Sequence, residues 1–84
     1  MDDERVWLVE RTYSQRDLVT LVYATSDGER YLRKEKAAHL GGDATAAIEV
    51  SPDRLSPVDD EDDLERYASE AARMAEKHDP DETI

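Results

Sequence analysis

The sequence predicts an α+β fold: a four-stranded, mostly antiparallel meander (β-β-β-β-α) with one C-terminal amphipathic helix packed on the sheet. Three observations predict it. Stretches rich in β-branched and aromatic residues fill the first half of the chain, an Asp-Gly turn separates two of them, and apolar residues recur at helical spacing near the end. Because 84 residues hold one core, we expect one domain over residues 5–78, with a disordered N-terminus at 1–4 and a disordered acidic tail at 79–84.

The first two predicted strands carry the clearest strand signals. Residues 5–13 are rich in β-branched and aromatic side chains, and residues 18–25 form the strongest such run in the chain. The segment from Ser14 to Asp17 reads as a turn between them. Asp27-Gly28 follows the second strand and favours a type I′ hairpin turn, in which both central residues have positive φ.

This hairpin turn fixes the register of the third predicted strand, residues 30–36. A two-residue turn pairs Tyr23 with Leu32 and Val22 with Arg33. Alternation along the strands then separates two apolar faces. One carries Val19, Leu21, Tyr23 and Leu32, and the other carries Leu18, Val22, Ala24 and Tyr31, with Trp7 and Val9 joining one of them.

The chain after the third strand is open to two interpretations. Residues 34–40 fit either a continuing strand or a helical turn, since Gly41 behind them is a typical helix C-cap. The segment 41–43 reads as a loop and residues 45–50 as a short fourth strand, which Ser51-Pro52 ends.

Apolar periodicity over residues 64–78 predicts the C-terminal helix. Ser56 and Asp59 fit the capping pattern of a hydroxyl followed three residues later by an acid, so the helix is expected to begin near them. The consecutive acids at 59–63 complement the positive end of the helix dipole. Asp79-Pro80 is expected to stop the helix.

Both faces of the predicted sheet are apolar, yet one helix covers only one of them. An uncovered apolar face marks a partner surface, and a second copy of the chain is the simplest partner. We therefore expect a non-enzymatic protein-interaction module that forms a homodimer. Its predicted interface consists of Trp7, Val9, Leu18, Val22 and Tyr31.

A nucleic-acid-binding accessory role is the alternative function. Basic side chains and an aromatic ring share the third strand, an arrangement on which several folds stack single-stranded nucleic acid. The competing interpretation is that these cations pair with acids on neighbouring strands and protect a sheet edge. The residues concerned are Arg30, Tyr31, Arg33, Lys34 and Lys36.

The chain is strongly acidic, with 22 Asp and Glu against 11 Lys and Arg and a net charge of -11. This charge excludes broad electrostatic affinity for nucleic acid or for an anionic membrane. The chain is rich in acids, poor in Lys and without Phe, a composition that indicates adaptation to molar salt. At ~1 M salt the Debye length falls to ~3 Å, so repulsion among the carboxylates is screened. We expect monovalent ions at the acidic surface.

The absence of Cys excludes disulfides and thiolate metal sites. The apolar runs are far shorter than a membrane span, and the acids at residues 2–4 stand where a signal peptide carries basic residues. We therefore expect a cytoplasmic protein without a membrane segment.

No motif assigns a catalytic, metal or cofactor site. Asp59, Glu61, Asp63 and Glu70 match four positions of a calcium-binding EF-hand loop, but Leu64 stands where that loop requires Gly. The two His residues have no metal-binding or catalytic context, and the phosphate-binding GxxxxGK[ST] and GxGxxG motifs are absent. We expect no catalytic residue, no metal and no cofactor.

Three stretches of the chain, residues 19–30, 45–50 and 65–74, resemble short acidic uncharacterised proteins of halophilic archaea. The resemblance extends over nearly the whole chain. It implies an archaeal protein in a salt-rich cytoplasm, and it carries no activity and no functional residue across.

Overall fold

The computed structural model describes residues 2–13, 17–37 and 44–84. In these ranges five strands form one sheet, and a single α-helix packs on it. The strands are β1 (Glu4–Tyr13), β2 (Leu18–Ala24), β3 (Arg30–Ala37), β4 (Ala47–Val50) and β5 (Ser56–Pro57), a 3-10 turn η2 spans Pro52–Arg54, and the helix is α1 (Glu61–Lys77).

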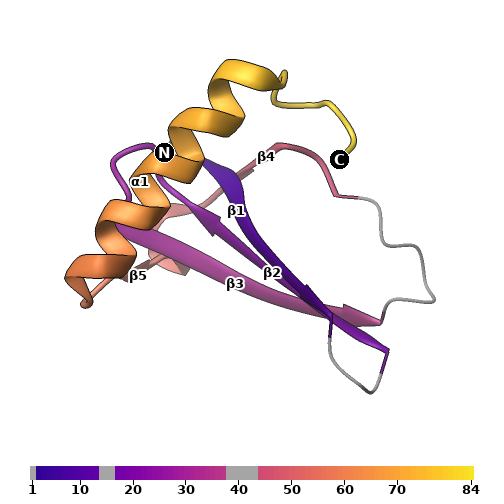
Figure 1. Ribbon diagram of the computed structural model, residues 1–84, viewed down its shortest axis with the longest axis horizontal. Helices are drawn as coiled ribbons and strands as arrows, with labels where there is room; N and C mark the ends of the chain where they lie inside the picture. Colours follow the sequence, from indigo (N-terminus) through magenta and orange to yellow (C-terminus); the bar gives the residue numbers. More distant parts are fainter. Residues whose placement is uncertain (1, 14–16, 38–43) are drawn as a thin grey trace.

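The order of strands across the sheet is β4-β1-β2-β3-β5, and each neighbouring pair is antiparallel (Figure 1). The predicted α+β fold, with an antiparallel sheet and one C-terminal helix packed on it, is confirmed. The meander extends only through the first three strands, because β4 crosses to pair with β1 instead of β3. The two-residue strand β5, which the sequence did not predict, takes the place beside β3.

The predicted register of the β2–β3 hairpin is confirmed, since Tyr23 lies opposite Leu32 and Val22 opposite Arg33. The predicted type I′ turn is wrong. Among the described residues only Asp17 and Gly28 have positive φ, so Asp27 does not adopt the conformation that a type I′ turn needs. Instead the N–H of Gly28 donates to the carbonyl of Thr25, and Gly28 alone turns left-handed, at φ 75°.

The register of β1 against β2 shifts between Leu8 and Glu10. Leu8 lies opposite Tyr23 and Glu10 lies opposite Val22, which leaves Val9 as an extra residue in β1. Such a β-bulge changes which face the following residues occupy. As a result Glu10 lies on the same face as α1, where its carboxylate contacts Arg66 at 3.0 Å.

We name the two faces of the sheet by their relation to α1. On the helix face, Tyr67 packs with Val22, and Ala71 packs with Trp7. On the opposite face, Val19, Leu21 and Tyr23 are at most 3% exposed. Partly buried Ile48 and Leu55 pack against that second cluster. Most apolar side chains on both faces are therefore buried within one chain.

Helix α1 begins at Glu61, later than the Ser56 capping pattern predicts. Its N-cap is Asp60, whose carboxylate accepts hydrogen bonds from the N–H groups of Asp62 and Asp63. The helix lies over one end of the sheet, and β1, β2 and β3 extend beyond it toward the lower right of Figure 1. Part of the helix face therefore stays uncovered.

Residues 79–84, for which the sequence predicts a disordered tail, lie beside residues 44–47. The carbonyls of Pro80 and Glu82 accept hydrogen bonds from the N–H groups of Ala47 and Ala46. The sequence also leaves residues 34–40 undecided, and the described part of that segment is strand up to Ala37. The predicted turn at 14–16, residues 38–40 and the loop at 41–43 lie outside the described residues.

Candidate functional site

The residues of the predicted dimer interface lie mostly inside the chain. Trp7 and Val22 are 8% and 5% exposed, and Val9 and Tyr31 are partly buried in the clusters that α1 covers. Leu18 is 37% exposed at the far end of the helix face. These five residues lie on one face, but it is the face on which α1 packs and not the uncovered face that the sequence predicted for the interface, and they do not form an exposed patch.

The basic residues of the predicted nucleic-acid contact are divided between the two faces of the sheet. Tyr31 and Arg33 lie on the helix face, because Tyr31 packs with Tyr67 and Arg33 lies opposite Val22. Strand alternation puts Arg30, Lys34 and Lys36 on the opposite face. The aromatic ring is thus separated from most of the cations that were expected to surround it.

Two of these cations contact acids of the same chain. Arg30 pairs with Glu4 at 3.0 Å, and Arg33 pairs with Glu35 at 3.3 Å. Lys34 is exposed on β3. The two acids lie on β1 and on β3 itself, so neither pair joins β3 to a neighbouring strand as the sequence-based interpretation expected.

A groove of about 540 Å³ lies on the helix face, where α1 leaves the sheet uncovered. We call it the acidic groove. Strands β1, β2 and β3 form its floor, and the segment that joins β5 to α1, together with the first turns of the helix, forms its wall. Its lining residues are Glu10, Thr12, Thr20, Val22, Tyr31, Arg33, Pro57, Val58, Asp59, Asp60, Asp63 and Tyr67.

The charge of this groove is negative. Four carboxylates against one arginine give the lining residues a formal charge of -3, and two of these carboxylates, Glu10 and Asp63, pair with Arg66 outside the lining. Asp60 is engaged as the N-cap of α1. Asp59 is exposed, and no other described residue forms a hydrogen bond or ion pair with it.

A guanidinium of the chain itself lies at the rim of the acidic groove. Arg66 contacts Glu10 at 3.0 Å and Asp63 at 3.2 Å, and its guanidinium carbon lies 5.1 Å from the centre of the Tyr67 ring. Burial raises the pKa of the Tyr67 hydroxyl, and the carboxylates of Asp63 and Glu10 raise it further. The rim therefore holds a cation by two carboxylates and one aromatic face.

Two tyrosines form the aromatic part of the groove. The rings of Tyr31 and Tyr67 have centroids 6.3 Å apart and are tilted by 50°. Val22, nearly buried beneath them, joins the same cluster. The lining thus combines Val22 and two tyrosine rings with carboxylates and threonine hydroxyls, a mixture that suits the aliphatic stem and charged head of Lys or Arg.

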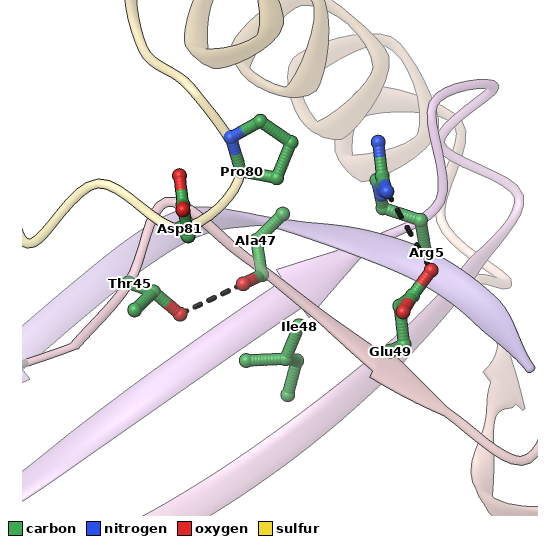
Figure 2. Close-up of a pocket in the computed structure, with 7 residues that line it drawn as sticks. All are labelled: Arg5, Thr45, Ala47, Ile48, Glu49, Pro80 and Asp81. Carbon is green, nitrogen blue, oxygen red and sulfur yellow. Dashed lines mark hydrogen bonds and ion pairs between the residues drawn. The ribbon is translucent and has the colours of Figure 1, made fainter.

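A second cavity, of about 490 Å³, lies beside β4 and the C-terminal segment (Figure 2). Several of its polar groups are paired with one another: Arg5 contacts Glu49 at 3.5 Å, and the hydroxyl of Thr45 donates to the carbonyl of Ala47. The cavity offers no cluster of convergent charges comparable with the acidic groove.

Within residues 2–13, 17–37 and 44–84, no group of three or more His, Asp or Glu side chains is arranged to hold a metal ion. His78, the C-cap of α1, contacts Glu82, and His39 lies outside the described residues. In those same ranges, no helix combines the length and apolar character that a membrane span requires.

Sequence reasoning missed the acidic groove because its members come from four distant segments. Glu10 is brought to it by the β-bulge, which no residue pattern in β1 announces. From sequence, Asp59 and Asp63 were expected to interact with the positive end of the helix dipole, and Tyr67 was expected to pack in the core. The signal that was available is strand alternation, which separates Tyr31 from Lys34 and already argues against one basic aromatic surface.

The whole chain, residues 1–84, matches the model of a family of unknown function, DUF7967, and it belongs to that family. No curated protein and no solved structure matches the chain.

Proposed function

Since this family carries no assigned activity, we propose from the structure that the chain is a non-enzymatic protein-interaction module that binds a basic segment of a partner protein in the acidic groove. The observation that carries the proposal is the groove itself. It combines about 540 Å³ of space, a lining charge of -3 and two tyrosine rings.

The geometry at the rim supports a cationic ligand. Arg66 is held there by Glu10, Asp63 and the ring of Tyr67. Asp59 belongs to the same lining and has no such partner among the described residues. A Lys or Arg of the partner that enters between Asp59 and the tyrosines makes the same kinds of contact, an ion pair and a cation–π interaction.

We place this module in the salt-rich cytoplasm of a halophilic archaeon. The support is the net charge of -11, the scarcity of Lys and the resemblance to acidic haloarchaeal proteins. At ~1 M salt the Debye length is ~3 Å, so attraction between more distant exposed charges is largely screened. Recognition there depends on direct contact inside a groove more than on long-range attraction.

The partner that we propose differs from the homodimer expected from sequence. Four of the five residues predicted for that interface are buried or partly buried under α1. A dimer through them would require the helix to leave the sheet, which would expose Trp7 and Val22. A partner with its own basic segment needs no such rearrangement.

Nucleic acid is the weaker candidate. Its phosphates would meet a chain of net charge -11, and the cations of β3 are divided between two faces. The acidic groove, where Tyr31 lies, repels phosphate.

Binding of synthetic peptides tests the proposal. The probe is an octapeptide that alternates Arg and Thr, titrated by calorimetry at about 0.1 M and about 2 M KCl. We expect it to bind, and a peptide that alternates Glu and Thr to fail. Asp59→Asn should weaken binding about three- to fivefold, as the loss of one partly solvated ion pair does. Glu76→Gln removes an exposed acid outside the groove and should change nothing.

Two results would refute the proposal. One is the absence of binding of the Arg-Thr peptide at both salt concentrations. The other is equal binding to the unsubstituted chain, Asp59→Asn and Glu76→Gln, which would show a non-specific attraction to the acidic surface.

A further inference from the structure

We infer that the partner segment binds as an extended strand, paired antiparallel with the open edge of β3 between Arg33 and Ala37. The inference rests on the proposed function and specifies how the same partner is held. Its side chains on the helix face enter the acidic groove, and its main chain adds a strand to the sheet.

The direction of the main-chain groups along β3 follows from two hydrogen bonds. The carbonyl of Arg30 accepts from the N–H of Thr25, on the β2 side, and the carbonyl of Glu29 accepts from the N–H of Val58, on the β5 side. Main-chain groups alternate between the two sides of a strand. The N–H and C=O groups of Arg33, Glu35 and Ala37 therefore point outward, away from β2.

Strand β5 shows that this edge accepts an antiparallel strand. It pairs with β3 only at Arg30 and Tyr31, and it ends there. Pro57 lies opposite Arg30, whose main-chain groups face β2, so the N–H that proline lacks is not needed. No other strand in the described part of the chain pairs with β3 on this side.

The open edge is exposed and adjoins the groove. Residues 33–35 of β3 are exposed, and Arg33 belongs both to the edge and to the lining of the acidic groove. A strand laid along the edge thus places alternate side chains on the helix face, next to Arg33 and Glu35 and at the margin of the groove. Its other side chains lie on the opposite face, beside Lys34.

The charges of the two faces specify the partner's pattern. On the helix face Glu35 lies on the edge itself and the groove lining has a formal charge of -3, which together favour Lys or Arg on this face, whereas Arg33 disfavours a cation directly opposite itself. On the opposite face the exposed Lys34 favours acidic or neutral polar residues at the positions between them. A second copy of β3 does not fit this pattern, because pairing of two β3 edges centred on Lys34 would place the two Lys34 side chains opposite each other.

One substitution separates main-chain pairing from side-chain attraction. Glu35→Pro removes an outward N–H, and proline is tolerated at such an edge position. Glu35→Ala removes the same carboxylate but keeps the N–H. We expect Glu35→Pro to bind the Arg-Thr octapeptide at least about tenfold more weakly than Glu35→Ala does, which corresponds to about 1.4 kcal/mol.

Further peptides extend the test to the unsubstituted chain, should Glu35→Pro fail to fold. Two versions of the Arg-Thr octapeptide are N-methylated, one at every Arg and the other at every Thr. In an extended strand each version loses the N–H donors on one of its two edges. A peptide of the same composition in the order Arg-Arg-Thr-Thr-Thr-Thr-Arg-Arg keeps the charge and loses the alternation. We expect the peptide without alternation to bind more weakly than the Arg-Thr octapeptide. We also expect weaker binding of one of the two N-methylated versions, the one whose methyl groups face β3.

The outcomes distinguish the two levels of the proposal. Binding of the Arg-Thr peptide that is weakened by Asp59→Asn supports the groove as the binding site. If that binding is unchanged by Glu35→Pro, by either N-methylation and by loss of the alternation, strand pairing is refuted. If no peptide binds, both are refuted.

Discussion

Gly28 and Ala68 are in direct contact, so that the turn of the β2–β3 hairpin is pressed against helix α1. A Cβ atom at Gly28 would stand 2.6 Å from the backbone nitrogen of Ala68 and 2.5 Å from the carbonyl oxygen of Leu64. The hairpin turn thus adds to the packing of Tyr67 and Ala71 that joins the helix to the sheet.

Gly28→Ala is therefore expected to destabilise the chain strongly. The left-handed φ at this position destabilises alanine by about 1 kcal/mol relative to glycine. The overlap of its Cβ atom with the helix backbone lowers the free energy of unfolding by about a further 1–3 kcal/mol. Urea unfolding should show a loss of about 3 kcal/mol, whereas Ser26→Ala, in the exposed part of the same turn, should change little. Equal stability of the two variants would contradict the packing described.

Ala71 and Ala72 provide a matched pair on α1. Ala71 is fully buried against Trp7 and the alanines of β4 and its preceding turn, and Ala72 is exposed. Ala71→Leu should lower the free energy of unfolding by about 1–3 kcal/mol because the added atoms do not fit. Ala72→Leu should alter it by less than about 0.5 kcal/mol. Similar losses in both variants would show that Ala71 does not lie on the side of α1 that packs against the sheet.

Asp27 supplies a test by pH. The hydroxyl of Thr25 and then the N–H of Glu29 donate to its carboxylate and lower the pKa of Asp27. A carboxyl with a lowered pKa stabilises the folded chain above its unfolded pKa of about 3.9, and this contribution disappears as the pH falls through the folded pKa.

The stability difference between the unsubstituted chain and Asp27→Asn should thus be full above about pH 5 and shrink below about pH 4. Chemical unfolding at a series of pH values measures it, with the exposed Asp2→Asn as the control. A difference that stays constant down to about pH 2 would show that the hydrogen bonds of Asp27 do not favour its ionised form.

Salt should stabilise the fold. With 22 carboxylates on 84 residues, self-repulsion opposes compaction in dilute buffer, and salt screens it. The free energy of unfolding should rise by at least about 1 kcal/mol between about 0.1 M and about 2 M KCl. Circular dichroism during thermal unfolding measures the change, and equal cooperativity and stability in both solutions would remove the argument for a salt-rich compartment.

The parts of the fold that sequence predicts are those with a local pattern. The register of Tyr23 against Leu32 follows from the length of the connection, and the connection keeps that register although its turn is of another type. The helical spacing around Tyr67 and Ala71 likewise identifies the face that packs on the sheet.

The parts that sequence does not predict depend on pairing between distant segments. Four residues of β4 carry no signal that selects β1 over β3, and β5 is too short to leave a pattern. The bulge at Val9 reverses the face of Glu10, and with it the location of a charged groove. A candidate site assembled by such pairings is visible only once the topology is known.

Amide hydrogen exchange tests the central claim most directly. With the Arg-Thr octapeptide bound, the account predicts slower exchange at the outward N–H groups of Arg33, Glu35 and Ala37, and little change at Leu32, which is already paired with β2. Protection that is uniform along β3, or confined to residues outside the groove and its edge, would contradict recognition of a basic strand at this site.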